Sequence, residues 1–497
     1  MVEVLLNKIL QKEDIRQNLS KLREEIKDIN KKQKLAFFCN EHKEEIIDLL
    51  NNEDAKTRKN AALLMGDLGK DYFIEPLYEG YMRENQRFVK SAYLNSLQYF
   101  DCSIYMGELK EQLRKLNTIE LNEDNTKHIQ EEIRALSKLI ISEEGINTHT
   151  FIGEKQVFDC ILLGNRNYNH ITEALVNEVL PNAELIPFKA GVRVKTRNIE
   201  KLFEIRTYKE LLIVIPDLTS VPKNPNEAAQ KIISSQLKNM LKNAHVEDDA
   251  FYFRIELKSK MQLDEKAKFN KKLSSELERL SKRYFINAAS NYELEIRLIE
   301  NKEGSFNVLI KLGTLNDDRF RYRSEHIATS IQPSNAALLV QLAKEYMVDN
   351  AQVLDPFCGV GTMLIERQNI VKANTSYGID YYAPAINKAK VNTEGAGQII
   401  HYINKNILDF KHDYLFDEIF TNMPYATGHT ETGEIEKLYR DFLNKAKKLM
   451  VPEGVIIMYT HDANLVNKLA SKNGYEILDK FEITKKIETW LYVLKRV

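Results

Sequence analysis

The sequence predicts a multidomain protein with three parts: an all-α part over residues 1–150, an α+β part over 151–318 and an α/β part over 319–497. Three observations support this division. In the first part, apolar residues recur at helical spacing. In the second, short strand-like runs are interspersed with helical ones. In the third, strands and helices alternate, and the first strand runs into a glycine-spaced turn, which is the opening unit of a doubly wound parallel sheet.

The composition fits a soluble globular protein, since 43% of the 497 residues are hydrophobic and 29% are charged. This length exceeds a single hydrophobic core. With 71 Lys and Arg against 72 Asp and Glu, the charge balance neither requires a nucleic-acid partner nor excludes one. Neither a signal peptide nor a membrane span is expected, because the chain has no basic start before an apolar run and no stretch of 18 apolar residues.

The cysteines are too few and too scattered to form a disulfide framework. They are Cys39, Cys102, Cys160 and Cys358, and no two of them show C-x-x-C spacing. A zinc site is therefore not expected either, and no other metal site is predicted. A reducing cytoplasm is the expected compartment.

The all-α part is rich in Leu, Lys, Glu and Ile and has little proline or glycine. Two of its stretches look alike, residues 57–69 and, about 32 residues later, residues 89–100. The first resembles the inner helix of a HEAT repeat, an antiparallel helix pair that stacks on its neighbours. An irregular helical bundle is the alternative. In either case this part is expected to dock RNA or a protein partner rather than to perform chemistry.

The α+β part contains five strand-like runs and three helical ones. The strands are predicted at residues 157–163, 211–215, 251–257, 294–299 and 306–312, and the helices at 171–180, 202–207 and 264–283. The lysines and arginines of this part are those of an ordinary solvated surface, so on composition alone it is not assigned to nucleic-acid binding.

The first strand of the α/β part ends at Asp355, within the motif formed by residues 355–362 (DPFCGVGT). Gly359 and Gly361 lack a Cβ, so the backbone can turn sharply there and approach a ligand. The helix that follows offers free N–H groups and a positive dipole end to a polar group above the loop.

A second acidic residue, Asp380, ends the next strand, 25 residues after Asp355. A carboxylate at this place can accept hydrogen bonds from two adjacent ribose hydroxyls, whereas a helix-capping aspartate is the alternative. A third strand-and-turn segment follows at residues 403–410. There, Asn406 or Asp409 could bond the exocyclic amine of an adenine ring, on which Ile407 would pack.

Residues 416–425 (FDEIFTNMPY) carry the sharpest signal, a strand that leads into Asn422, Pro424 and Tyr425 beside the glycine loop. An exocyclic amine on a base is a poor nucleophile, because its lone pair is spread into the ring. The Asn422 oxygen and a backbone carbonyl next to Pro424 can accept the amine hydrogens and aim the lone pair at a methyl carbon, while Tyr425 offers a stacking face. A sulfonium leaving group would make a strong base unnecessary. An Asx turn with a packed tyrosine is the alternative.

The motifs at 355–362 and 422–425 together resemble those of class I S-adenosylmethionine-dependent amino-methyltransferases. Residues 319–323 (RFRYR) and 331–337 (IQPSNAA) resemble the lead-in of the THUMP-domain guanine-N2 RNA methyltransferases. The resemblance covers about residues 152–497. It implies a ferredoxin-like and THUMP-like region that holds structured RNA, followed by a Rossmann-like methyltransferase domain.

The same resemblance implies methyl transfer from S-adenosyl-L-methionine to N2 of a guanine, with tRNA expected before rRNA. It implies that the cofactor is bound by Asp355, Phe357, Gly359, Gly361, Thr362, Asp380, Asn406 and Ile407. The guanine would be flipped out of its stack toward Asn422, Pro424 and Tyr425, the predicted catalytic residues.

Two departures from the family pattern affect the expected base pocket. Met423 stands where a second proline is frequent, and residues 426–428 (ATG) follow where a glycine directly after the aromatic is usual. Other functions remain open, namely a DNA adenine-N6 methyltransferase, a non-catalytic HEAT-repeat scaffold that retains the cofactor fold, and a dinucleotide dehydrogenase. The THUMP-like middle argues against the first, the intact motif residues against the second and the missing third glycine against the last.

Overall fold

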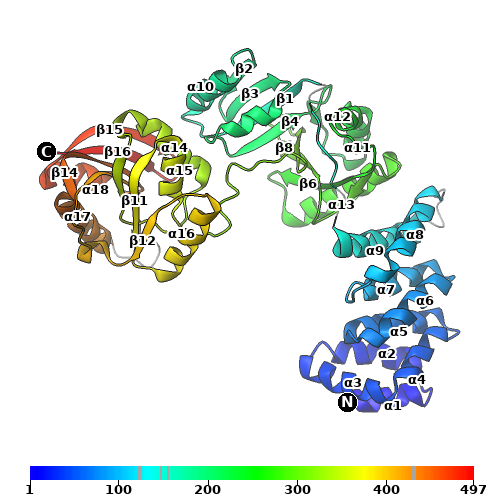
Figure 1. The fold of residues 1–497 in the computed structure, drawn as a ribbon. Coiled ribbons are helices and arrows are strands. Elements are labelled where there is room, and N and C mark those ends of the chain that lie inside the picture. The colour runs from blue at the N-terminus through cyan, green and yellow to red at the C-terminus, as the bar shows by residue number, and fades with distance from the viewer. Residues whose placement is uncertain (120–125, 146–147, 154–155, 427–431) are drawn as a thin grey trace. The chain divides into compact units, whose positions relative to one another are not determined.

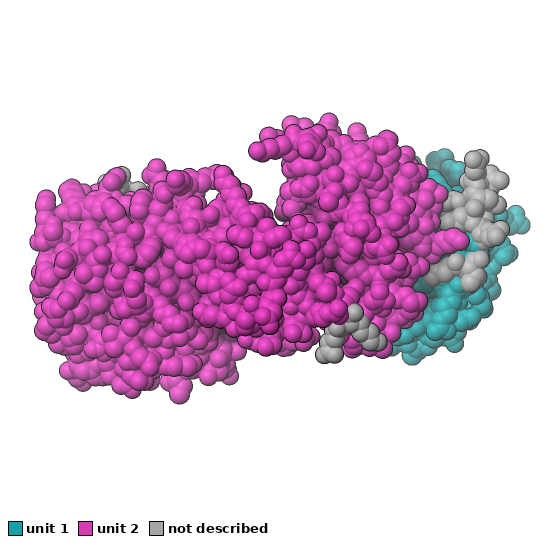
Figure 2. All heavy atoms as spheres, turned by 90° about the horizontal axis from the view of Figure 1, so that it is seen from above, with its two compact units in different colours: residues 1–148, 288–291 teal, residues 149–287, 292–497 magenta. Residues whose placement is uncertain are grey.

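The computed structural model describes residues 1–119, 126–145, 148–153, 156–426 and 432–497. The chain divides into two compact units, coloured separately in Figure 2. One consists of residues 1–148 with 288–291, and the other of residues 149–287 with 292–497. Within the described residues, no helix has both the length and the apolar character needed to cross a membrane.

The first unit is helical. Its helices are α1 (Val2–Leu10), α2 (Ile15–Glu25), α3 (Ile29–Glu41), α4 (Lys43–Asp48), α5 (Ala55–Leu68), α6 (Ile74–Arg83), α7 (Arg87–Leu97), α8 (Met106–Thr118) and α9 (Thr126–Glu144), with the 3-10 turns η1 (Leu49–Asn51), η2 (Asp71–Phe73) and η3 (Ser103–Tyr105). α5 packs against α2 and α7, and α7 packs against α9. At Gly66 the two helices α5 and α7 approach closely, since a Cβ there would lie 2.7 Å from Ser96 Cα. The two look-alike stretches fall on α5 and α7, and their assignment to HEAT repeats stays a prediction.

The second unit begins with a mixed sheet and its covering helices. The strands are β1 (Phe158–Leu163), β2 (Glu184–Phe188), β3 (Gly191–Thr196), β4 (Glu210–Val214), β5 (Ser220–Val221), β6 (Phe251–Lys258), β7 (Phe285–Asn287), β8 (Leu294–Glu300) and β9 (Phe306–Leu312), and the helices are α10 (Asn169–Val179), η4 (Ile199–Glu204), α11 (Pro225–Ser234), α12 (Leu237–Ala244) and α13 (Leu263–Leu280). The strand order is β2-β3-β1-β4-β9-β8-β6-β7, and β5 pairs with β9. All five predicted strands of this part are confirmed, as β1, β4, β6, β8 and β9.

The helix predicted over residues 202–207 is wrong. The chain forms only the short 3-10 helix η4 and leaves it at Glu204. The carbonyls of Ile205 and Tyr208 accept hydrogen bonds from the Arg319 guanidinium, at 2.9 and 3.0 Å. Because the buried Arg319 side chain takes these carbonyls, they are not available to continue a helix.

The last part of the chain forms a seven-stranded sheet. Its strands are β10 (Ala351–Asp355), β11 (Ala373–Asp380), β12 (His401–Asn404), β13 (Phe416–Asn422), β14 (Met450–Thr460), β15 (Tyr475–Thr484) and β16 (Thr489–Arg496), and its helices are α14 (Pro333–Ala343), η5 (Lys344–Tyr346), α15 (Thr362–Ile370), α16 (Ala383–Gly395), η6 (Ile407–Asp409), α17 (Thr432–Leu449), α18 (Ala463–Leu469) and η7 (Ser471–Asn473). The order is β12-β11-β10-β13-β14-β16-β15. Figure 1 draws this part of the chain in colours that run from yellow at β11 and β12 to red near the C-terminus. The described strands run parallel except β16, which is antiparallel to both of its neighbours. The predicted doubly wound sheet is therefore confirmed.

Neighbouring residues of the central strands face opposite sides of this sheet. Val353 packs into a core with α14 and α15, whereas Leu354 packs into a core with α17 and α18. A buried ion pair ties α15 to the sheet, since the Arg367 guanidinium donates to the Glu418 carboxylate at 2.8 and 3.0 Å. The direction of winding reverses beside β10, so a crevice is expected between the carboxyl ends of β10 and β13.

Candidate active site

A cavity of about 500 Å³ opens at the carboxyl ends of β10, β11, β12 and β13. Its walls come from the loops after these strands, from α15 and α17, and from residues 327–331 ahead of α14. This volume lies in the range of cofactor and small-ligand sites. The cavity therefore occupies the switch point at which doubly wound sheets bind their ligands.

The two loop glycines are needed for different reasons. Gly359 and Gly361 have φ of 52° and 83°, which is the left-handed region that side chains other than hydrogen disfavour. A Cβ on Gly361 would lie 2.2 Å from the Tyr402 hydroxyl oxygen, whereas a Cβ on Gly359 would meet no described atom within 4 Å. Gly361 is thus required by close packing against β12, and Gly359 by its backbone conformation and its place on the cavity wall.

Asp380 links the ends of the first two strands. One of its carboxylate oxygens accepts from the Gly359 N–H at 2.9 Å, and the other accepts from the Tyr382 N–H at 2.9 Å. The residue also lines the cavity. Each carboxylate oxygen has a second lone pair, so Asp380 can hold the glycine loop and accept hydrogen bonds from a ligand at the same time.

Asp355 lies beneath the loop, fully buried, and is not among the described residues that line the cavity. One carboxyl oxygen accepts from the Phe357 N–H at 3.1 Å and from the Thr421 hydroxyl at 2.6 Å. Burial raises the pKa of Asp355 from 3.8 to about 7, and the charge of Asp380 adds to the shift, while the two hydrogen bonds oppose it. The structure therefore gives Asp355 a part in shaping the turn, and its contact with a cofactor stays a prediction.

The third predicted unit contributes Asn406 and Ile407 to the wall. Asn406 caps η6 by accepting from the Leu408 N–H at 3.0 Å, and Ile407 is buried with its side chain in the core. Of the two candidates for an adenine amine, Asn406 lines the cavity, whereas Asp409 is not among the described lining residues.

The end of β13 presents an unused acceptor. Asn422 lines the cavity, and its Oδ1 is buried without a hydrogen-bond partner among the described residues. The rest of the motif is tied down, because the Met423 N–H donates to the Tyr459 carbonyl at 2.9 Å and the Pro424 carbonyl accepts from the Tyr439 hydroxyl at 3.3 Å. An acceptor held on a fixed turn is suited to bind a donor such as an amine.

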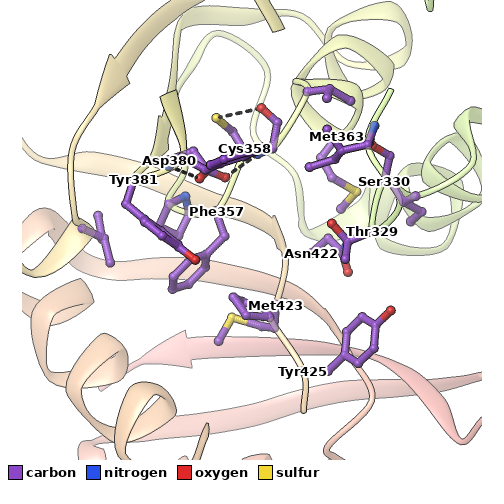
Figure 3. A pocket seen from close by; sticks show the side chains of 18 of the residues that line it. Thr329, Ser330, Phe357, Cys358, Met363, Asp380, Tyr381, Asn422, Met423 and Tyr425 are labelled. Carbon is purple, nitrogen blue, oxygen red and sulfur yellow. Dashed lines mark hydrogen bonds between the residues drawn. The ribbon is translucent and has the colours of Figure 1, made fainter. Parts of the chain in front are cut away.

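The cavity has two distinct ends. Figure 3 shows Asp380 and Tyr381 at one end, and Asn422, Thr329 and Tyr425 at the other. The structure brings together nine of the predicted site residues on the cavity wall, which are Phe357, Gly359, Thr362, Asp380, Asn406, Ile407, Asn422, Pro424 and Tyr425. Of the continuation at 426–428, Thr427 and Gly428 lie outside the described residues.

Several wall residues were not predicted from the sequence. They are Ile327, Thr329, Ser330, Met363, Tyr381, Tyr382, Lys405, Ile435 and Leu438. Tyr381 is 79% exposed although it lines the cavity. Two consecutive tyrosines directly after Asp380 are a sequence signal that could have identified this edge of the site.

The wall has polar groups suited to a small polar cofactor. Thr362 opens α15, and its hydroxyl is buried without a partner among the described residues. The helix has no side-chain cap in the described structure, so its first N–H groups also face the loop. No group of three or more His, Cys, Asp or Glu within the described residues is placed to hold a metal ion.

Residues 321–488 match the family model described as UPF0020: RMKL-like, methyltransferase domain. The matched segment contains every residue of the cavity wall. The carboxyl-terminal part of the chain therefore matches a methyltransferase domain over the segment that carries the cavity.

Two archaeal proteins are similar to the chain in sequence. The tRNA (guanine(10)-N2)-dimethyltransferase of Methanothermobacter thermautotrophicus is 31% identical over 130 residues, which are 26% of this chain and 38% of that protein. The tRNA (guanine(6)-N2)-methyltransferase of Methanocaldococcus jannaschii is 22% identical over 219 residues, covering 35% of this chain and 57% of that protein. The chain thus spans between 38% and 57% of these relatives.

Two solved structures share the fold over a longer stretch. TrmN from Thermus thermophilus has a TM-score of 0.51 at 16% identity, over 69% of this chain and 100% of that one. The structure of SMU.472 complexed with SAH has a TM-score of 0.52 at 17% identity, over 68% of this chain and 98% of that one. At this level of identity, the likeness concerns the fold.

Proposed function

We propose that this chain methylates the exocyclic N2 of a guanine in structured RNA, with tRNA as the class of RNA we expect. One observation carries the proposal: the buried Asn422 Oδ1 has no partner among the described residues and lines the cavity at the end opposite Asp380. An acceptor at the end of β13 suits an amine that must lose its conjugation with a ring before it can attack.

The residues of the opposite end fit the adenosine part of the cofactor. Asp380 would accept from the ribose hydroxyls, Asn406 would bond the adenine amine and Ile407 would pack on the ring. Gly359 and the first N–H groups of α15, with the unpartnered Thr362 hydroxyl, would meet the polar amino-acid part. When bound, S-adenosyl-L-methionine supplies a methyl group on a positively charged sulfur, which leaves as a neutral thioether.

The motif at 422–425 would position the guanine amine. Asn422 Oδ1 accepts one amine hydrogen. Since the Pro424 carbonyl already accepts from Tyr439, the Met423 carbonyl is the acceptor we propose for the second. Both bonds draw the nitrogen toward tetrahedral geometry and direct its lone pair into the cavity, while Tyr425 stacks on the base.

The relatives support RNA as the substrate and N2 of guanine as the target, because both are named tRNA guanine-N2 methyltransferases. Under this proposal the mixed sheet of residues 151–318 acts as the THUMP-like region that holds RNA by shape and backbone contacts. The helical part over residues 1–150 would dock RNA or a protein partner, and the reaction would take place in the cytoplasm.

The test is a tritiated methyl-transfer assay with the full chain on unmodified tRNA transcripts, rRNA transcripts and duplex DNA, followed by mass spectrometry of the labelled nucleosides. We expect N2-methylguanosine from tRNA. Asn422→Ala should lower kcat about 100-fold with unchanged cofactor affinity, because its acceptor acts on the amine during transfer. Asn444→Ala, an exposed asparagine of α17, is the control and should behave as wild type. N6-methyladenine in DNA, or no transfer to any of the three substrates, would refute the proposal.

A further inference from the structure

Tyr425 is stacked on a residue that lies 36 positions further along the chain, His461. Their ring centroids are 4.1 Å apart with an interplanar angle of 28°. The sheet explains how they meet. β13 and β14 are parallel, with Asn422 paired to Tyr459, so the residues just beyond the two strand ends emerge side by side at the same edge.

His461 has a contact of its own besides the Tyr425 ring. Tyr425 is a wall residue, whereas His461 is not among the described residues of the wall. The imidazole interacts with the backbone of Ile487, in the turn between β15 and β16. Just before it, the buried Thr460 hydroxyl lies 2.7 Å from the Tyr439 hydroxyl, the same group that donates to the Pro424 carbonyl. Residues at the end of β14 therefore support the turn at 422–425 in two places. Thr460 supports the backbone of the turn through Tyr439, and His461 packs on the Tyr425 ring.

The surroundings of His461 also affect the charge of its imidazole. Burial lowers its pKa below the usual value, although the charge of Asp462 and the Ile487 backbone oppose the shift. Burial thus favours the neutral form of the ring, which adds no positive charge beside a site that would receive a sulfonium.

We propose that His461 is a positioning residue for the target base: it covers one face of the Tyr425 ring and fixes the ring's orientation, so that the flipped guanine stacks on the remaining face. This assignment rests on the proposed function. It requires a flat ring at position 461 and makes no use of proton transfer by the imidazole. Because stacking holds the base equally in the ground state and the transition state, its loss should appear mainly in KM.

Three variants of the full chain test the assignment in the methyl-transfer assay on unmodified tRNA transcripts. His461→Ala should raise KM for RNA about tenfold and lower kcat less than threefold. His461→Phe keeps a flat ring and should stay within about twofold of wild type. His412→Ala is the matched control, because His412 also lies 4.1 Å from a tyrosine ring, that of Tyr414, but outside the cavity wall of the described residues. It should leave both constants unchanged.

A readout that needs no RNA tests the stack directly. In the proton NMR spectrum, the His461 ring protons should move downfield in Tyr425→Leu, as the tyrosine ring current is lost, while those of His412 stay in place. Normal kinetics of His461→Ala, or equal defects in His461→Ala and His461→Phe with intact cofactor binding, would overturn the stacking role. Failure of the wild-type chain to methylate any RNA would instead refute the proposed function on which it rests.

Discussion

Gly361 is the loop residue that leaves least room for a side chain, and its replacement by alanine tests how the loop is built. At φ of 83°, alanine costs about 1–2 kcal/mol of left-handed strain. The new Cβ would lie 2.2 Å from the Tyr402 hydroxyl oxygen and 3.1 Å from its Cζ, so the ring must retreat. That retreat adds about 1–3 kcal/mol through overpacking and through weakening of the 2.7 Å hydrogen bond between the Tyr402 and Thr393 hydroxyls.

We therefore expect Gly361→Ala to destabilise the methyltransferase domain by about 3 kcal/mol. It should also weaken cofactor affinity, because the displaced loop includes Gly359, which lines the cavity. Denaturant unfolding gives the first quantity and titration calorimetry with S-adenosyl-L-methionine gives the second. Gly397→Ala is the control, because Gly397 has φ of 62° and no described atom within 4 Å of an added Cβ. It should cost only the strain, about 1–2 kcal/mol.

A double-mutant cycle separates the clash from the strain. Tyr402→Phe removes the oxygen that the new methyl group meets, so Gly361→Ala in the Tyr402→Phe background should cost about 1 kcal/mol less than in wild type. Equal costs at Gly361 and Gly397, or a cycle without coupling, would show that the loop does not pack on Tyr402 as described.

Three other predictions concern the cofactor, the core and the middle sheet. Asp380→Asn keeps an acceptor for the Gly359 N–H but loses the charge, so cofactor affinity should fall about tenfold in calorimetry while RNA affinity in filter binding is unchanged; equal loss of both would contradict the ribose role. Glu418→Gln leaves the buried Arg367 charge unpaired and should cost about 3–5 kcal/mol in denaturant unfolding, against no change for the exposed Glu434→Gln. Burial lowers the pKa of His149, but the hydrogen bond and charge of Glu293 outweigh it and raise the pKa overall. The pair's stabilisation is therefore complete below pH 6.5 and lost as the pH rises through the raised value. Melting temperatures at pH 6 and pH 9 should differ more for wild type than for His149→Gln, and equal differences would remove the pair from the pH dependence.

The sequence predicted the doubly wound sheet well because its signals are local. Asp355, Gly359 and Gly361 lie within seven residues of one another, and each marks a feature that neighbouring residues decide, namely a strand end, a left-handed turn and a helix start. In the middle part, the strand β2 was missed because it contains Pro187, and proline is tolerated there because β2 lies at the edge of the sheet. Helix α11 was also missed, although Asn224 followed by Pro225 is a helix-start signal, and the Asn224 side chain does cap the helix.

The sequence predicted site residues that end a strand, but it did not predict which of them reach the cavity. Asp355 and Asp380 both end strands, but one is buried beneath the loop and the other lines the cavity, because the loop folds over the first strand end. No local pattern distinguishes these outcomes, since each depends on what packs against the carboxylate.

His461 shows most clearly what local patterns cannot supply. Its stack with Tyr425 depends on β13 and β14 being neighbours in register, and strand order is a property of the whole sheet. The support for the amine site therefore comes from two strand ends that converge, one bearing the acceptor and the stacking ring and the other bearing the groups that fix them. If the target base binds at this edge, substitutions at the end of β14 should change RNA kinetics without touching the cofactor. Substitutions of the residues after β12, at the opposite end of the cavity, should weaken cofactor binding and leave the RNA kinetics unchanged.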